Sequence, residues 1–136
     1  VSAILVLCGF FSVLLRAGWR PGDDVGDGSS LGHAYHVATA VTFAGIVACQ
    51  IGTAMASRTE SVSTREIGFF SNRLLLWGIL FEVVFAALIV YLPTLQDVFH
   101  TAALGPVELA TIASFPVVVW VADEMWRARR RSHAGS

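Results

Sequence analysis

Residues 74–92 read LLLWGILFEVVFAALIVYL, and Glu82 is the one charged residue in this stretch. A helix needs about 20 mainly apolar residues to cross the hydrocarbon core of a bilayer, and about 17 to 25 are tolerated. The stretch therefore predicts a membrane-spanning helix. Three further apolar blocks, separated by polar segments, lie at Val1–Leu15, Ala38–Ala56 and Leu104–Val121.

Together the blocks predict an all-α fold, a polytopic membrane helix bundle of four transmembrane helices. The first block is short, and it begins at Val1 inside an apolar run. We therefore expect the chain to be part of a longer protein that starts upstream. A secretory signal peptide is the rival interpretation of this block, but it lacks a basic leader and a clear cleavage site of small residues.

The composition agrees with a membrane protein. Of all residues 55% are hydrophobic and only 14% are charged, and the mean hydropathy is +0.68, whereas soluble domains are about a quarter charged. A net charge of −1 gives no support to nucleic-acid binding. We expect a membrane domain over residues 1–131 and a disordered tail at 132–136.

The arginines predict the orientation, because basic residues gather on the cytoplasmic side of membrane proteins. Two loops are poor in arginine: the loop between the first and second blocks, and the loop between the third and fourth. Together they hold only Arg16 and Arg20, along with several aspartates. We expect the arginine-rich segments, and with them both chain ends, to be cytoplasmic in a multi-pass protein of the cell (plasma) membrane. These segments contain Arg58, Arg65, Arg73, Arg127, Arg129, Arg130 and Arg131.

The second block carries two kinds of residue on different sides of its helix. Alanine or glycine recurs every four residues from Ala40 to Ala56, which places these small residues along one side. Such a stripe lets two membrane helices approach closely. Because a lipid-facing helix needs neither small nor polar stripes, we place this helix inside a bundle. The polar side consists of Thr39, Thr42, Gln50, Thr53 and Ser57.

Glu82 lies near the middle of the third block. An ionised carboxylate at that depth costs about 2.5–3.5 kcal/mol on insertion scales. Gly78 and Ala86, one turn to either side, leave room for a neighbouring helix over the carboxylate. Two interpretations stay open: a cation or proton site, or a protonated glutamate that is hydrogen-bonded to another helix for packing.

The loop at 17–30 is rich in Gly and Asp, which is typical of exposed turns. It lacks the alternating ligands and the closing glutamate of a calcium loop. His33 and His36 lie three residues apart, but two histidines without further ligands are weak grounds for a metal site. We interpret this segment as a polar approach to the second helix.

Catalytic signatures are missing from the sequence. It contains no phosphate-binding loop, nucleophile elbow or zinc signature. Cys8 and Cys49 lie within apolar blocks, where free thiols behave as small apolar groups. We therefore predict no catalytic residue, disulfide or cofactor in the chain itself.

Three stretches, in the correct order, resemble the C-terminal membrane region of P-type cation-transporting ATPases of type II, the sodium/potassium and calcium pumps. The stretch from Asn72 to Glu82, running on to Pro93, is similar to the ninth membrane helix of that family. The second block with Gln50 and Arg58 resembles the eighth helix. The segment 115–131, with Phe-Pro-Val-Val, Asp-Glu and three consecutive arginines, resembles the tenth helix and the cytoplasmic tail.

The resemblance implies that this chain is the C-terminal membrane domain of an ATP-driven pump. ATP, magnesium and the phosphorylated aspartate would then belong to the parent protein. The implied partners are the lipid bilayer, the upstream membrane helices, the cytoplasmic ATPase domains and a transported cation. Glu82, Gln50 and Thr53 are the candidate cation-path residues, although Thr53 stands where the sodium/potassium branch has an aspartate and calcium pumps have an asparagine.

An alternative function remains open from the sequence. A stand-alone four-helix membrane protein would act as a small proton-coupled transporter subunit or as a structural partner. It would need Glu82 and Gln50 to form a self-sufficient site.

Overall fold

The computed structural model describes residues 1–58 and 73–134, and in these ranges every regular element is a helix. The helices, in chain order, are α1 (Ser2–Arg16), α2 (Gly32–Arg58), α3 (Arg73–Tyr91), α4 (Pro93–Phe99) and α5 (Pro106–Ala134). The all-α prediction is confirmed. Arg65 of the predicted cytoplasmic loop lies outside the described residues, as do residues 135–136 of the predicted tail, whereas residues 132–134 belong to α5.

Three of the helices are long and apolar enough to cross a membrane. They correspond to Gly32–Ser57, Arg73–Tyr91 and Pro106–Arg130. Helix α1 is apolar but has only 15 residues. The structure thus supports three membrane spans, and the first predicted span, Val1–Leu15, is present as a short apolar helix.

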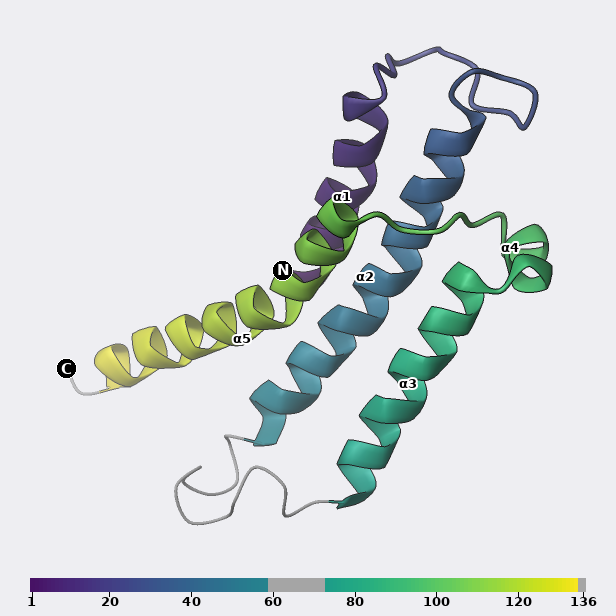
Figure 1. Ribbon diagram of the computed structural model, residues 1–136. Coiled ribbons are helices and arrows are strands. Elements are labelled where there is room, and N and C mark those ends of the chain that lie inside the picture. Colours follow the sequence, from purple (N-terminus) through teal and green to yellow (C-terminus); the bar gives the residue numbers. More distant parts are fainter. Residues whose placement is uncertain (59–72, 135–136) are drawn as a thin grey trace.

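Helix α2 is the centre of the bundle (Figure 1), because α1, α3 and α5 all pack against it. Its small-residue stripe is the contact side, as predicted: Ala40, Ala48, Gly52 and Ala56 are buried, and Ala44 packs against the core. Membrane helices gain little from hydrophobicity in lipid, so close van der Waals packing of this kind stabilises their association.

Phe115 and Pro116 of α5 fill the space that glycines leave on α2. A Cβ atom added at Gly45 would lie 2.9 Å from Phe115 Cε2, and one added at Gly52 would lie 2.8 Å from Pro116 Cα. Gly9 of α1 approaches the same phenyl ring, since a Cβ there would lie 3.2 Å from Phe115 Cζ. Three helices therefore meet at one aromatic side chain.

Helix α5 contains Pro116 in its interior. Proline has no N–H to donate to the carbonyl of Ile112, and its ring crowds that carbonyl, so a bend is expected. Figure 1 shows α5 changing direction along its length.

An ion pair at one end of the bundle and a hydrogen bond at the other join α5 to its neighbours. Glu108, in the first turn of α5, pairs with Arg16 at the end of α1, with Nη1 and Oε1 3.7 Å apart. Arg127 donates to the carbonyl of Ala56 at 2.9 Å, near the end of α2, and also pairs with Asp123.

The end of α3 is capped by one side chain of α4 and by one that follows it. In a continuing helix the carbonyl of Ile89 would accept from the N–H of residue 93, but Pro93 has none. Thr101, which is buried, donates its hydroxyl to Ile89 O at 2.9 Å, and Gln96 Nε2 donates to Val90 O. The caps fold α4 and His100 back against the end of α3.

Candidate functional site

The candidate cation-path residues lie on two neighbouring helices. Glu82 is partly buried on α3, while Gln50 and Thr53 are exposed on α2. Thr53 donates to the carbonyl of Cys49 in its own helix at 2.9 Å. Among the described residues, Glu82 makes no hydrogen bond or ion pair, so the structure does not join these three side chains into a closed site.

The rest of the polar side of α2 also bonds to its own helix. Thr39 donates to Tyr35 O and Thr42 donates to Ala38 O. Ser57 donates to the carbonyl of Ala54. Hydroxyl groups that are satisfied in this way remain acceptors for a further partner.

Helix α3 has a largely bare apolar surface. Only 11% of its most apolar window is buried, compared with 39% for α2. Its exposed side chains include large ones, with Trp77 at 68% and Phe81 at 71%. Gly78 has no heavy atom within 4 Å of an added Cβ, so the space beside Glu82 that the sequence predicts is open in the structure.

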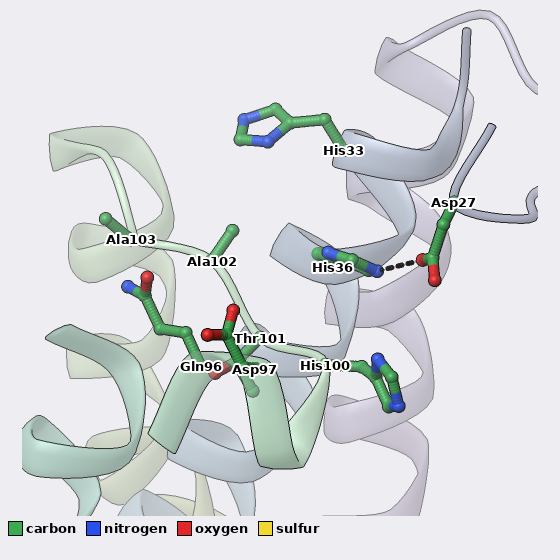
Figure 2. Close-up of a pocket in the computed structure, with 9 residues that line it drawn as sticks. All are labelled: Asp27, His33, His36, Gln96, Asp97, His100, Thr101, Ala102 and Ala103. Carbon is green, nitrogen blue, oxygen red and sulfur yellow. Dashed lines mark hydrogen bonds and ion pairs between the residues drawn. The ribbon is translucent and has the colours of Figure 1, made fainter. Parts of the chain in front are cut away.

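A second constellation lies at one end of the bundle, where the loop before α2 and the start of α2 meet the segment after α4. Asp27, His36 and His100 place one potential ligand atom each within 4.8 Å of the others. Figure 2 shows His36 joined to Asp27, with His100 beside them, whereas His33 points away. The three side chains border a pocket of about 570 Å³, which is also lined by His33, Gln96, Asp97, Thr101, Ala102 and Ala103.

A tight turn brings Asp27 to the first turns of α2. Asp24 accepts from the N–H of Gly26 at 2.9 Å, and Gly32, the first residue of α2, lies against the same loop. A Cβ on Gly32 would come within 2.7 Å of Gly26 O, so only glycine permits this approach. The result is a 2.8 Å contact between Asp27 Oδ1 and His36 Nε2.

His100 reaches the cluster through an unusual backbone conformation. It ends α4 with φ 51° and ψ 47°, in the left-handed region, and is the only described residue other than glycine with positive φ. Residues other than glycine seldom adopt this conformation, although histidine is among the enriched types. Its ring centroid lies 5.9 Å from that of His36, with the planes at 49°.

Sequence reasoning did not find this cluster. His36 was noted with His33, whereas the partners that the fold supplies are Asp27 and His100. The available signal was the combination of a Gly-Asp turn before one helix and a histidine shortly after Pro93, at loops on the same predicted side of the membrane. That combination shows which loops meet but not which side chains touch.

Comparisons with known proteins match most of the sequence to one family. The family described as "Cation transporting ATPase, C-terminus" matches residues 1–129. "Calcium-transporting ATPase 1" of Yarrowia lipolytica is 36% identical over 86 residues, which are 63% of this chain and 9% of the relative. "Calcium-transporting ATPase type 2C member 1" of Homo sapiens is 29% identical over 133 residues, which are 97% of this chain and 13% of the relative.

The chain therefore spans about a tenth of the length of these relatives. The matches favour the pump region that the sequence resembles over a stand-alone four-helix protein.

Proposed function

The chain belongs to the family of C-terminal regions of cation-transporting ATPases, and we propose that it forms the last membrane helices of an ATP-driven calcium pump. Calcium is the ion that the names of the relatives print. ATP and magnesium would bind to other domains of the pump. This chain would support the transport bundle and contribute to its ion path.

The observation that carries the proposal is the uneven burial of the helices. The small-residue side of α2 packs into the core with α1 and α5, whereas Gln50, Thr53 and Ser57 of its polar side and most of α3 are exposed. An acidic side chain such as Glu82 costs several kcal/mol when it faces lipid. Packing against the other membrane helices of a pump would cover these surfaces, and the polar groups would then face the protein interior.

Glu82, Gln50 and Thr53 are the residues that we propose to line or border the ion path. Carboxylate, amide and hydroxyl oxygens are the ligand types that calcium prefers. Intramembrane carboxylates commonly mark ion paths. The three side chains lie on neighbouring helices with exposed or partly buried positions, so oxygen ligands from further helices have access to them.

The proposed orientation places α1's N-terminus and the arginine-rich end of α5 in the cytoplasm. Arg127 and Arg130 lie at the same end of the bundle as Ala56, while Asp27 and His100 lie at the other. The aspartate-rich loop would then face the extracytoplasmic side of a plasma or internal membrane.

Substitution of Glu82 by Gln in the complete pump tests the proposed role in transport. The measurement is ATP-dependent uptake of radioactive calcium into membrane vesicles. We expect the calcium concentration that gives half-maximal uptake to rise more than about tenfold, because one charged ligand or its electrostatic effect is lost. Asp97→Asn is the matched control, since it removes an exposed carboxylate on α4, outside the spans. Its uptake should equal that of the unmodified pump.

Two results would separate the parts of the proposal. Unchanged calcium dependence of Glu82→Gln would make Glu82 a packing residue while leaving the pump assignment intact. Absence of ATP-dependent calcium uptake by the unmodified pump, with uptake of a different cation, would contradict calcium as the transported ion.

A further inference from the structure

We propose that Asp27, His36 and His100 form a binding site for a divalent transition metal ion of the zinc type. The three residues come from the loop before α2, from α2 itself and from the end of α4. The site lies at one end of the bundle, with His36 near the start of α2, and is separate from the proposed ion path at Glu82 and Gln50.

The ligand atoms need only small movements to reach metal distances. Two ligands of a tetrahedral zinc ion lie about 3.3 Å apart, as follows from Zn–N and Zn–O distances of about 2.0–2.2 Å. The three atoms are within 4.8 Å of one another, and Asp27 Oδ1 and His36 Nε2 are already 2.8 Å apart. The Asp27 side chain is 74% exposed, so it is free to rotate about its χ angles.

An ion would replace the hydrogen bond that now joins Asp27 to His36. A neutral imidazole nitrogen and a carboxylate oxygen are both metal ligands, and His36 binds a metal through Nε2 when its hydrogen is on Nδ1. His100 adds a second imidazole from a distant part of the chain, which an ordinary Asp–His ion pair does not require. The left-handed backbone of His100 places its ring beside that of His36.

The ligand set selects the class of metal. Two imidazoles and one carboxylate suit zinc and neighbouring transition metals, whereas calcium and magnesium prefer sets made only of oxygen ligands. The fourth ligand position opens into the pocket of about 570 Å³, which has room for several water molecules of about 30 Å³ each. The bound ion would therefore keep at least one water ligand, and it would not compete with calcium for an oxygen-only site.

A metal here would connect the beginning of α2 to the end of α3. Asp27 and His36 belong to the α2 end, while His100 is held at the α3 end by its neighbour Thr101, which donates to Ile89 O. Helices α2 and α3 make fewer mutual contacts than α2 makes with α1 or α5. The ion would therefore cross-link α2 and α3, which pack less extensively than α2 packs with α1 or α5.

Cobalt and zinc titrations of the full chain in lipid nanodiscs test the site. Co²⁺ has a visible absorption spectrum that reports nitrogen and oxygen coordination, and Zn²⁺ should displace it at one equivalent. We expect Asp27→Asn, His36→Ala and His100→Asn each to weaken binding more than about tenfold, because even changes beyond the direct ligands cost about 10–100-fold. Asparagine at residue 100 keeps the ability to adopt the left-handed backbone.

His33→Ala is the matched control, since His33 lies one turn away on α2 and lines the same pocket but is outside the cluster. It should bind both metals like the unmodified chain. Asp27 lies in an exposed loop, so Asp27→Asn should leave the fold intact. Weaker metal binding by this variant would then not be explained by misfolding. Absence of cobalt binding by the unmodified chain, or equal losses in His33→Ala and His36→Ala, would overturn the proposal.

Zinc should also raise the SDS concentration at which the helical signal of the unmodified chain is lost, because a ligand that binds only the folded state stabilises it. The midpoint should not move in His100→Asn. A zinc-dependent shift of the same size in both would show that zinc acts elsewhere. Loss of calcium transport in the complete pump would leave this result unaffected, so the two proposals fail separately.

Discussion

At the scale of single residues, Thr101 replaces a hydrogen-bond donor that Pro93 cannot supply. Its hydroxyl reaches the carbonyl of Ile89 at 2.9 Å, and only 4% of the residue is exposed. We expect Thr101→Val to destabilise the chain by about 1–3 kcal/mol, because the carbonyl loses its side-chain donor in a buried place while the shape is kept. The free energy of unfolding in mixed detergent–SDS micelles measures this change.

Thr94→Val provides the comparison for Thr101, since Thr94 is an exposed residue of α4. Its substitution should change the free energy of unfolding by less than about 0.5 kcal/mol. Equal effects of the two substitutions would mean that the Thr101 hydroxyl does not cap α3.

The same scale shows what a sequence can and cannot reveal about a site. Glu82 is conspicuous in the sequence because a carboxylate inside an apolar block is rare. Asp27 and His100 are ordinary loop residues, and their contact with His36 depends on a Gly32 that admits the loop and a Pro93 that turns the chain. Such contacts depend on the positions of whole helices, and these are not visible in residue types.

At the scale of helices, the close approach of α2 and α5 depends on Gly52. A Cβ at this position would lie 2.8 Å from Pro116 Cα and 3.0 Å from Pro116 O, and both are backbone atoms that cannot rotate away. We expect Gly52→Ala to destabilise the chain by about 1–3 kcal/mol, as is typical of overpacking. The measurement is again unfolding by SDS, with the helical signal as the readout.

Gly78→Ala is the control for Gly52, because no heavy atom lies within 4 Å of a Cβ added at this residue of α3. The isolated chain should be as stable with alanine there, or more stable, since alanine favours helix. A loss at Gly78 equal to the loss at Gly52 would contradict the packing described for α2 and α5.

Helix existence was more predictable than helix length. The apolar block 38–56 lies within α2, which extends from Gly32 to Arg58, and the block 104–121 corresponds to a helix that runs from Pro106 to Ala134. Hydropathy identifies only the apolar part of a helix, which lies in the hydrocarbon core. The helix itself continues through polar residues at the membrane surface. Helix α4, with seven residues, lies below the length at which an apolar period can be recognised.

At the scale of the whole molecule, burial decreases from α2 to α3. The order reflects the sequence: α2 has the small residues that permit close contact, whereas α3 has large ones such as Trp77 and Phe81. The sequence predicted a bundle with the helix of the second block inside it, because a lipid-facing helix needs no stripe of small residues. It did not predict how much of α3 this chain leaves uncovered, since that depends on how the helices pack against one another.

The orientation of the bundle can be tested by the reactivity of single cysteines at the two ends of α2. Gly28→Cys lies in the exposed loop before α2, where an added side chain meets no heavy atom within 4 Å, and Ser57→Cys is exposed near the other end. Both are introduced after Cys8 and Cys49 have been replaced by alanine. In right-side-out vesicles, a membrane-impermeant maleimide should label Gly28→Cys, and it should label Ser57→Cys only after permeabilisation, if the arginine-rich end is cytoplasmic as we propose. The opposite pattern would invert the orientation and place the Asp27 cluster in the cytoplasm, whereas labelling of both cysteines in sealed vesicles would show that α2 does not cross the membrane.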